Sequence, residues 1–195
     1  PEQTGLPFPF FVKPIKATWS VLARRVDNFA ELRQHLNFHP LEKFIIKRLV
    51  KPFNDVLHEN GVNDVDAHHL IAEELIDGHL VTLEGYAKEG EIHHLGITDS
   101  ILFPQTYAFK RFDYPSRLSP SVQKRMQDIA TKVMQATGFN FGLFNMELYY
   151  REEFDDIKIV EINPRLARQF CDMHEKVDGR NTFDLLLALH LDQPI

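Results

Sequence analysis

A hairpin pattern near the end of the chain constrains the fold more than any other feature. Two segments rich in apolar and aromatic residues, 143–150 and 157–162, flank the acidic stretch 151–156. Runs of this kind, separated by a short polar stretch, are typical of two antiparallel strands joined by a turn. The sequence therefore predicts an antiparallel hairpin here.

Acidic and amide side chains gather on one face of this predicted hairpin. Because alternate residues of a strand share a face, Asn145 lies with Glu147, and Glu161 lies with Asn163. If the strands pair across the turn, Glu147 falls close to opposite Glu161. Two carboxylates and an amide oxygen are hard ligands, suited to Mg²⁺ that bridges phosphates. Facing carboxylates repel each other, so the pattern indicates a cation or a buried shared proton, with a solvated acidic strand edge as the alternative.

A basic residue follows the second strand directly. Arg165 ends the run Glu-Ile-Asn-Pro-Arg. Its guanidinium is a planar fork of N–H donors, which is suited to a phosphate oxygen. Arg165 is therefore a candidate for binding an anion beside the acidic hairpin.

The rest of the chain predicts both strands and helices. Apolar runs and alternation predict strands at 10–13, 19–26, 69–76, 80–87 and 92–103. Cap residues and helical apolar spacing predict helices after Asp27 to 36, over 41–60, from Ser119-Pro120 to 138, and after Asn181 to 191. Pro52 is expected to kink the second helix or divide it in two. The aromatic, proline-punctuated segment 104–117 is expected to be an ordered loop.

These elements indicate an α+β fold with antiparallel sheets in two α+β lobes. The lobes are expected to span residues 1–77 and 78–195, divided by the turn after the strand at 69–76. A cleft between two lobes is where small ligands usually bind. Because the chain begins at Pro1 and passes almost at once into a strand, we expect a further domain upstream of it in the full protein.

The composition narrows the classes of partner. The formal net charge is −6, from 22 basic and 28 acidic residues, which argues against a nucleic-acid partner. Apolar runs are too short for a membrane helix, so we expect no membrane partner. A single cysteine, Cys171, excludes an internal disulfide framework and fits a reducing compartment, so the expected location is cytoplasmic. Cys171 is expected to be a packed side chain, and a homo-oligomer is left open.

Four motifs together resemble one family. Phe-Asn-Met-Glu-Leu at 144–148 and Glu-Ile-Asn-Pro-Arg at 161–165 resemble the metal-binding signature of ATP-grasp enzymes. Phe-Val-Lys-Pro at 11–14 looks like the family's strand with a phosphate-binding lysine. The segment 71–78 looks like its adenine-binding linker, and Pro-Ser-Arg-Leu-Ser at 115–119 occupies the usual place before the metal hairpin. The family includes biotin carboxylase, carbamoyl phosphate synthetase, D-alanine–D-alanine ligase and the L-amino acid ligases.

The resemblance implies a nucleotide site in a cleft between the two lobes. Lys13 would bind and neutralise nucleotide phosphates, as both a cofactor-binding and a catalytic residue. Adenine would be read largely through backbone groups of the linker, which comprises Glu73, Glu74, Leu75 and Ile76. The implied cofactor is ATP.

The resemblance also assigns roles in the hairpin. Glu147, Glu161 and Asn163 would hold one or two Mg²⁺ ions, or Mn²⁺, between phosphate oxygens. Arg165 would act as a catalytic residue by steadying the phosphoryl group in transfer.

Three features depart from the family pattern. The run 16–20 contains no glycine, where many members carry a glycine-rich loop over the phosphates. Leu80 occupies the position of a ribose-binding acid, so His79, Glu84 or no residue takes that role. A lysine expected on a preceding lobe is not part of this chain.

The resemblance implies an ATP-dependent ligase that activates a carboxylate as an acyl phosphate for attack by an amine. Its partners would be a small carboxylic or amino acid and an amine nucleophile. Candidate anchors for the substrate carboxylate are Arg111, Arg117 and Arg168. Two alternatives remain: a non-catalytic ATP-binding module, favoured by the missing glycines, and a carboxylase or formate-transferring subunit of a larger enzyme.

Overall fold

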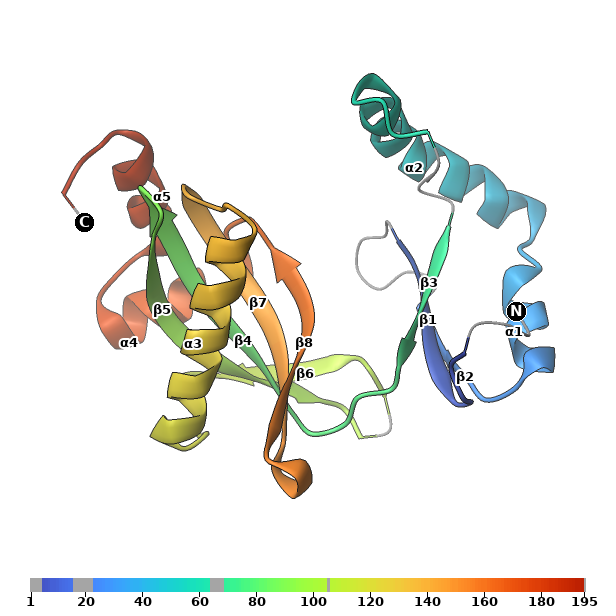
Figure 1. Ribbon diagram of the computed structural model, residues 1–195, viewed down its shortest axis with the longest axis horizontal. Coiled ribbons are helices and arrows are strands. Elements are labelled where there is room, and N and C mark those ends of the chain that lie inside the picture. The colour runs from blue at the N-terminus through green and yellow to red at the C-terminus, as the bar shows by residue number, and fades with distance from the viewer. Residues whose placement is uncertain (1–4, 16–22, 64–68, 105, 195) are drawn as a thin grey trace. The chain divides into compact units, whose positions relative to one another are not determined.

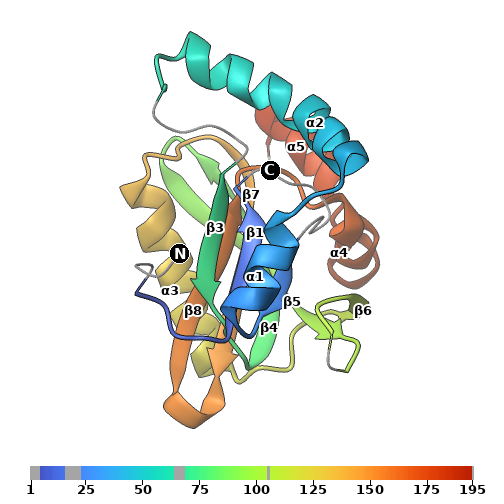
Figure 2. The same cartoon turned by 90° about the vertical axis from the view of Figure 1, so that its right-hand side faces the viewer.

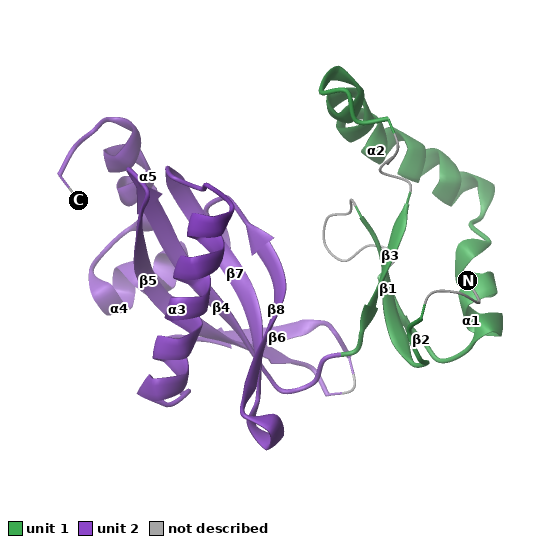
Figure 3. Ribbon diagram, in the orientation of Figure 1, with its two compact units in different colours: residues 1–75 green, residues 76–195 purple. Residues whose placement is uncertain are grey.

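The chain forms two compact units in the computed structural model, which describes residues 5–15, 23–63, 69–104 and 106–194. The units are Pro1–Leu75 and Ile76–Ile195 (Figure 3). Their boundary lies two residues from the division expected after residue 77. Each unit combines helices with an antiparallel sheet, as expected for an α+β fold.

The smaller unit is built on a three-stranded sheet. Strand β1 (Phe10–Pro14) lies between β2 (Arg24–Val26) and β3 (Leu70–Glu74) and is antiparallel to both. Figure 2 shows β1 and β3 side by side. β2 lies within the predicted strand 19–26, of which 19–22 fall outside the described residues. A small core forms where one face of the sheet meets the first helix, from Phe10, Val12, Val26 and Leu32.

The first helix, α1 (Phe29–Leu36), starts one residue later than predicted. The side-chain oxygen of Asn28 accepts a hydrogen bond from the backbone N–H of Glu31 at 3.0 Å. The prediction of Asp27 as the cap is therefore wrong. The Asp27 carboxylate instead accepts hydrogen bonds from the Arg25 guanidinium at 2.6 and 2.8 Å, so it does not serve the helix amides.

The second helix, α2 (Pro40–Glu59), runs through Pro52 without division. The prediction left a kink or two helices open, and the structure has one helix. A capping box supports its start, where the His39 ring accepts from the N–H of Leu41 and the Glu42 carboxylate accepts from the N–H of His39. In the described part of the chain, no helix is both long enough and apolar enough to cross a membrane.

The larger unit is built on a five-stranded antiparallel sheet in the order β6–β5–β4–β7–β8. The strands are β4 (His79–Lys88), β5 (Glu91–Leu102), β6 (Phe109–Asp113), β7 (Gly142–Arg151) and β8 (Asp156–Asn163). The strands predicted at 80–87 and 92–103 and the predicted hairpin are confirmed. The prediction of 104–117 as loop alone is wrong, because β6 pairs with the end of β5 and forms the sheet edge. A short 3₁₀ turn, η1 (Glu152–Phe154), closes the hairpin of β7 and β8.

Helix α3 (Pro120–Ala136) crosses one face of this sheet (Figure 1). It begins as predicted at Ser119, whose hydroxyl accepts from the N–H of Val122 at 3.4 Å. The main core lies between this helix and the sheet. It comprises Val81, Leu83, Ile97, Val122, Met126, Ala130, Met134, Phe144, Met146 and Leu148.

Two helices follow the hairpin and pack on side chains of the other face. A 3₁₀ turn, η2 (Arg168–Phe170), leads into α4 (Cys171–Asp178), which the sequence did not predict. No side chain caps α4, so its start carries no sequence signal. Helix α5 (Thr182–His190) begins at Asn181, as predicted. A second core in this unit comprises Tyr86, Leu143, Leu185 and Leu189.

Candidate functional site

A one-residue bulge in β8 sets which side chains of the hairpin face each other. On the side of the turn, Leu148 pairs with Ile159, whereas Glu147 pairs with Glu161. Val160 is the extra residue between these two pairs. An unbroken ladder would place Glu147 opposite Val160 and would turn Glu161 to the other face, because side chains alternate along a strand. The bulge therefore brings the two carboxylates onto one face.

The next pair on the same face consists of two amides. Asn145 pairs with Asn163, and the Asn163 side-chain amide donates to Asn145 Oδ1 at 3.2 Å. The buried Asn145 amide in turn donates to the backbone oxygen of Arg165 at 3.1 Å. The Arg165 guanidinium donates to Asn163 Oδ1 at 3.4 Å. Buried Asn145 thus fixes both Asn163 and the backbone at Arg165.

Polar residues continue this face across the sheet. Thr82 on β4 pairs with Glu147 on one side and with Thr98 on the other, while Glu84 pairs with Asn145. The intervening positions of the same strands, such as Leu83, point to the core under α3. One face of the sheet is therefore apolar under α3, and the other is polar around the hairpin acids, with the second core at one end.

The hairpin residues suit a magnesium ion completed by other oxygens. Glu147 is half-buried and Glu161 is exposed, so a ligand can reach them. Among the described residues, no three His, Cys, Asp or Glu side chains gather to form a closed metal site. Magnesium commonly takes one or two protein carboxylates and completes its shell with water and substrate phosphates. Two carboxylates beside the Asn163 amide match that donor set.

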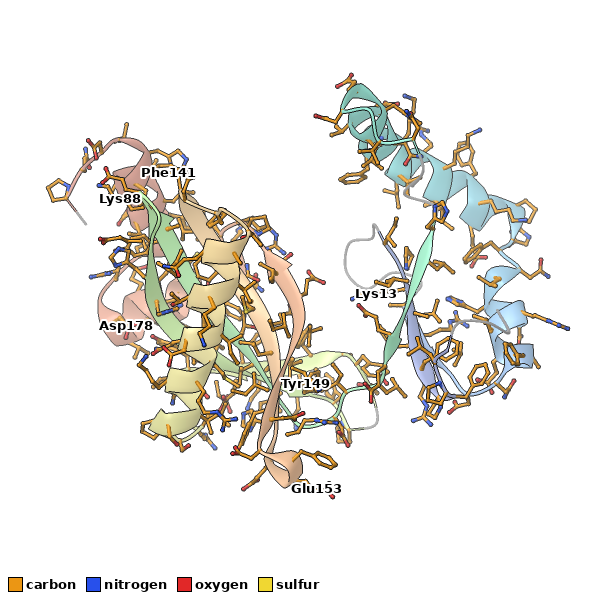
Figure 4. The ribbon with its side chains drawn as sticks, viewed as in Figure 1. Lys13, Lys88, Phe141, Tyr149, Glu153 and Asp178 are labelled. Carbon is orange, nitrogen blue, oxygen red and sulfur yellow. The ribbon has the colours of Figure 1, made fainter. Side chains whose placement is uncertain are left out.

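The predicted phosphate lysine and the first linker acid form an ion pair in the smaller unit. Lys13 Nζ lies 2.8 Å from Glu73 Oε2, and both side chains are partly exposed. Lys13 lies on β1 (Figure 4). Glu73 lies on the neighbouring strand β3. Strand β3 ends at Glu74, so Leu75 and Ile76 lie beyond the sheet ladder. An anion bound at Lys13 would compete with the Glu73 carboxylate.

Comparison with known families gives a decisive match. The family model for the ATP-grasp domain matches residues 6–173 of this chain. This chain belongs to the ATP-grasp family. No curated protein sequence matches it.

Solved structures show the same ATP-grasp fold. The chain is 18% identical to an L-amino acid ligase from Bacillus licheniformis, with a TM-score of 0.66 over 95% of this chain and 39% of that one. The biotin carboxylase–beta-gamma-ATP complex from Campylobacter jejuni is 18% identical, with a TM-score of 0.67 over 93% of this chain and 36% of that one. A biotin carboxylase domain from Hydrogenobacter thermophilus, in complex with MgADP and bicarbonate, is 16% identical, with a TM-score of 0.69 over 96% and 37%. The chain therefore spans less than half the length of each of these proteins.

The structure describes some of the positions at which the sequence departs from the ATP-grasp pattern. The glycine-free run 16–20 lies outside the described residues. Leu80, at the position of the ribose-binding acid, is buried. Of the two substitutes considered, His79 Nε2 lies 3.1 Å from a carboxylate oxygen of Asp99, and Glu84 is bound by a histidine of α4. Glu84 therefore already has a hydrogen-bond partner, whereas the short contact of His79 with Asp99 lacks hydrogen-bond geometry.

A chain of polar groups runs from buried Glu84 through buried His174 to the exposed Asp178. His174 Nε2 lies 2.6 Å from Glu84 Oε2, and His174 Nδ1 lies 3.1 Å from Asp178 Oδ2. The Tyr114 hydroxyl donates to the same Asp178 oxygen at 2.5 Å. Burial raises the pKa of Glu84, although the His174 hydrogen bond lowers it in part. Burial and the Asp178 hydrogen bond raise the pKa of Tyr114. These contacts join α4 to the sheet directly beside the amide pair.

The three arginines considered for the substrate lie on separate elements. Arg111 on β6 donates to the Asp113 carboxylate at 2.9 Å, and this hydrogen bond lowers the pKa of Asp113. The exposed Arg117 side chain approaches the same carboxylate at 3.9 Å. Arg168 is exposed at the start of η2. The structure thus brings Arg111 and Arg117 to one carboxylate, and a substrate role for any of the three stays a prediction.

Proposed function

We propose that this chain supplies the ATP- and magnesium-binding machinery of an enzyme that activates a carboxylate as an acyl phosphate for attack by an amine. The observation that supports it most is the pairing of Glu147 with Glu161 on the polar face of the sheet. Facing carboxylates without a cation would repel each other. A bound cation makes the pairing favourable.

Each predicted residue has a role in this proposal. Glu147, Glu161 and Asn163 hold Mg²⁺, or Mn²⁺ in its place, which would neutralise charge on the nucleotide phosphates. Lys13 exchanges its contact with Glu73 for a phosphate oxygen of ATP. The segment Glu73–Ile76 binds the adenine, largely through backbone groups.

The chemistry takes place in two steps. A carboxylate oxygen of the acid substrate attacks the γ-phosphorus of ATP, the bond to the bridging oxygen breaks, and ADP leaves. The amine nucleophile then attacks the acyl carbon, phosphate leaves, and the amine gives up a proton. Arg165 donates hydrogen bonds to the phosphoryl oxygens as charge develops on them.

The similar structures support ATP as the nucleotide, but they do not identify the acid that accepts the phosphoryl group. One similar protein was solved with MgADP and bicarbonate, and another is an L-amino acid ligase. We favour a small carboxylic or amino acid, with bicarbonate as the alternative acid in a carboxylase. We further propose that the enzyme works in the cytoplasm.

The test uses the full-length protein with ATP, Mg²⁺ and hydroxylamine. Hydroxylamine captures an acyl phosphate as a hydroxamate, so a panel of carboxylates should give ADP and hydroxamate in equal amounts. ATP binding without any carboxylate-dependent ADP release would overturn the ligase proposal in favour of a binding module. ADP release that depends on bicarbonate alone would point to a carboxylase.

A further inference from the structure

A cavity of about 460 Å³ opens beside Arg165 in the larger unit. It lies among the start of β7, the loop after β8 and helix α5. Its apolar walls comprise Phe139, Phe141, Leu143, Leu166 and Leu186. This volume falls in the range of cavities that bind small molecules, about 300–1,000 Å³.

Arg165 connects this cavity to the acidic hairpin. Its guanidinium donates to the backbone oxygen of Leu166 at 3.2 Å and to Asn163 Oδ1 at 3.4 Å. These two bonds use only part of a group with five N–H donors. Arg165 is exposed, so its other donors can meet an anion. One side chain thus touches a proposed metal ligand and lines an apolar cavity.

Aromatic contacts hold two walls of the cavity in place. Phe141 meets His190 edge-on at 5.1 Å between ring centres, and Phe139 meets Phe144 edge-on at 6.1 Å. Phe144 belongs to the main core, so the Phe139 wall rests on a rigid support. Figure 4 marks Phe141 close to the start of β7. A ligand that fills the cavity would bury apolar surface, which favours binding.

We propose that the acid substrate carries a bulky apolar side chain, aliphatic or aromatic, that lodges in this cavity. Its carboxylate is then held at Arg165, beside the hairpin where the phosphoryl group arrives. The inference rests on the proposed function for the reaction itself. It adds the class of substrate: apolar carboxylic or amino acids are preferred over glycine and acetate.

The test compares two substitutions on neighbouring residues of α5. Leu186→Trp fills the cavity, whereas Leu187→Trp adds the same bulk at a side chain that is 58% exposed and does not line it. Hydroxamate formation is measured with L-leucine, L-phenylalanine and 3-phenylpropanoate, and with glycine and acetate as small acids. The expected kcat/KM for the unaltered protein favours the large acids by about 100-fold, as apolar pockets discriminate by roughly 10–200-fold per methylene. Leu186→Trp should remove that preference, and Leu187→Trp should keep it.

A binding measurement tests the cavity proposal independently of the proposed reaction. Calorimetric titration of 3-phenylpropanoate into the full-length protein with MgADP reports the cavity without turnover. Binding that Leu186→Trp abolishes and Leu187→Trp retains supports the cavity even if no hydroxamate forms, in which case only the proposed reaction fails. The cavity proposal is overturned if 3-phenylpropanoate does not bind, or if the two variants bind it equally. A correctly folded Leu186→Trp variant is confirmed by its circular dichroism.

Discussion

His174 Nε2 lies 2.6 Å from Glu84 Oε2, and both side chains are only 3% exposed. The contact joins helix α4 to the strand β4, at the position directly across from Asn145. Asn145 in turn fixes Asn163 and the backbone of Arg165. The buried imidazole therefore supports the proposed site from beside the amide pair, without belonging to it.

The His174 contact predicts how stability depends on pH. Burial lowers the pKa of His174, but hydrogen bonds to Glu84 and Asp178 outweigh it, so the pKa lies above its ordinary 6.5. The protonated form of His174 therefore stabilises the folded state. This contribution to stability is complete below pH 6.5 and is lost as the pH rises through the pKa of His174 in the folded protein. We expect Tm to fall across that range. His174→Gln should lower Tm at acidic pH and flatten the dependence of Tm on pH. His190→Gln, at an exposed histidine, should leave that dependence unchanged. The same slope of Tm against pH in the unaltered protein and both variants would contradict the argument.

The hairpin acids predict the loss of catalysis from one substitution. Glu161→Ala removes one of the two proposed carboxylate ligands, so Mg-ATP turnover should fall by about 100-fold or more. Even the loss of a residue that only hydrogen-bonds to a metal ligand lowers metal affinity or activity by about 10- to 100-fold. Because Glu161 is exposed, the fold should be retained. Steady-state ADP release measures the effect. The control is Glu153→Ala at the hairpin tip (Figure 4), which removes an exposed carboxylate from η1 and should leave turnover unchanged.

Lys13 predicts a change in nucleotide affinity. Lys13→Ala removes the proposed phosphate contact, and a charged hydrogen bond is worth about 1.5–3 kcal/mol, so the KM for ATP should rise about 10- to 100-fold. The matched control is Lys51→Ala, which breaks a comparable ion pair with Asp55 on α2. An unchanged KM for ATP in Lys13→Ala, measured by ADP release at varied ATP, would remove the lysine from the nucleotide site.

The close packing at Gly85 predicts a loss of stability. A Cβ atom there would lie 2.5 Å from the backbone oxygen of His93 and 2.7 Å from the Phe144 ring. Both groups belong to the sheet and its core, so neither can move freely, and overpacking of this kind costs about 1–3 kcal/mol. Urea unfolding of Gly85→Ala should show that decrease in the free energy of unfolding. Glu91→Ala, an exposed change on the adjacent strand, should show almost none.

Local patterns in the sequence predicted the parts of the fold that depend on neighbouring residues. Strand alternation placed Asn145 with Glu147 and Glu161 with Asn163, whereas the bulge at Val160, which brings the two acids onto one face, left no signal in the sequence. Ser119 and Asn181 began helices as expected. The prediction of Asp27 as the helix cap was wrong because the Arg25 guanidinium, two residues earlier, binds the Asp27 carboxylate, and Asn28 caps the helix instead. Two adjacent polar residues give the same cap signal, and only their contacts separate them.

Long-range contacts explain what the sequence did not predict. Glu84 and His174 are 90 residues apart, and nothing in either segment indicates that they meet. Helix α4 lacks a side-chain cap, and strand β6 forms by pairing at the edge of β5. The cavity beside Arg165 arises where three separated segments converge. Features of this kind follow from packing and leave no periodic signal along the chain.

The unpaired Val160 determines which changes in length the hairpin can accept. Insertions at the tip, within 152–155, leave the offset in β8 intact, so the acidic pair keeps its orientation. Deleting one residue from 157–160 removes the offset and rotates Glu161 toward the underside of α3, where its charge would be stranded among methionine and phenylalanine side chains. Natural variation in loop length is therefore expected at the tip, while the spacing from the bulge to Arg165 stays constant.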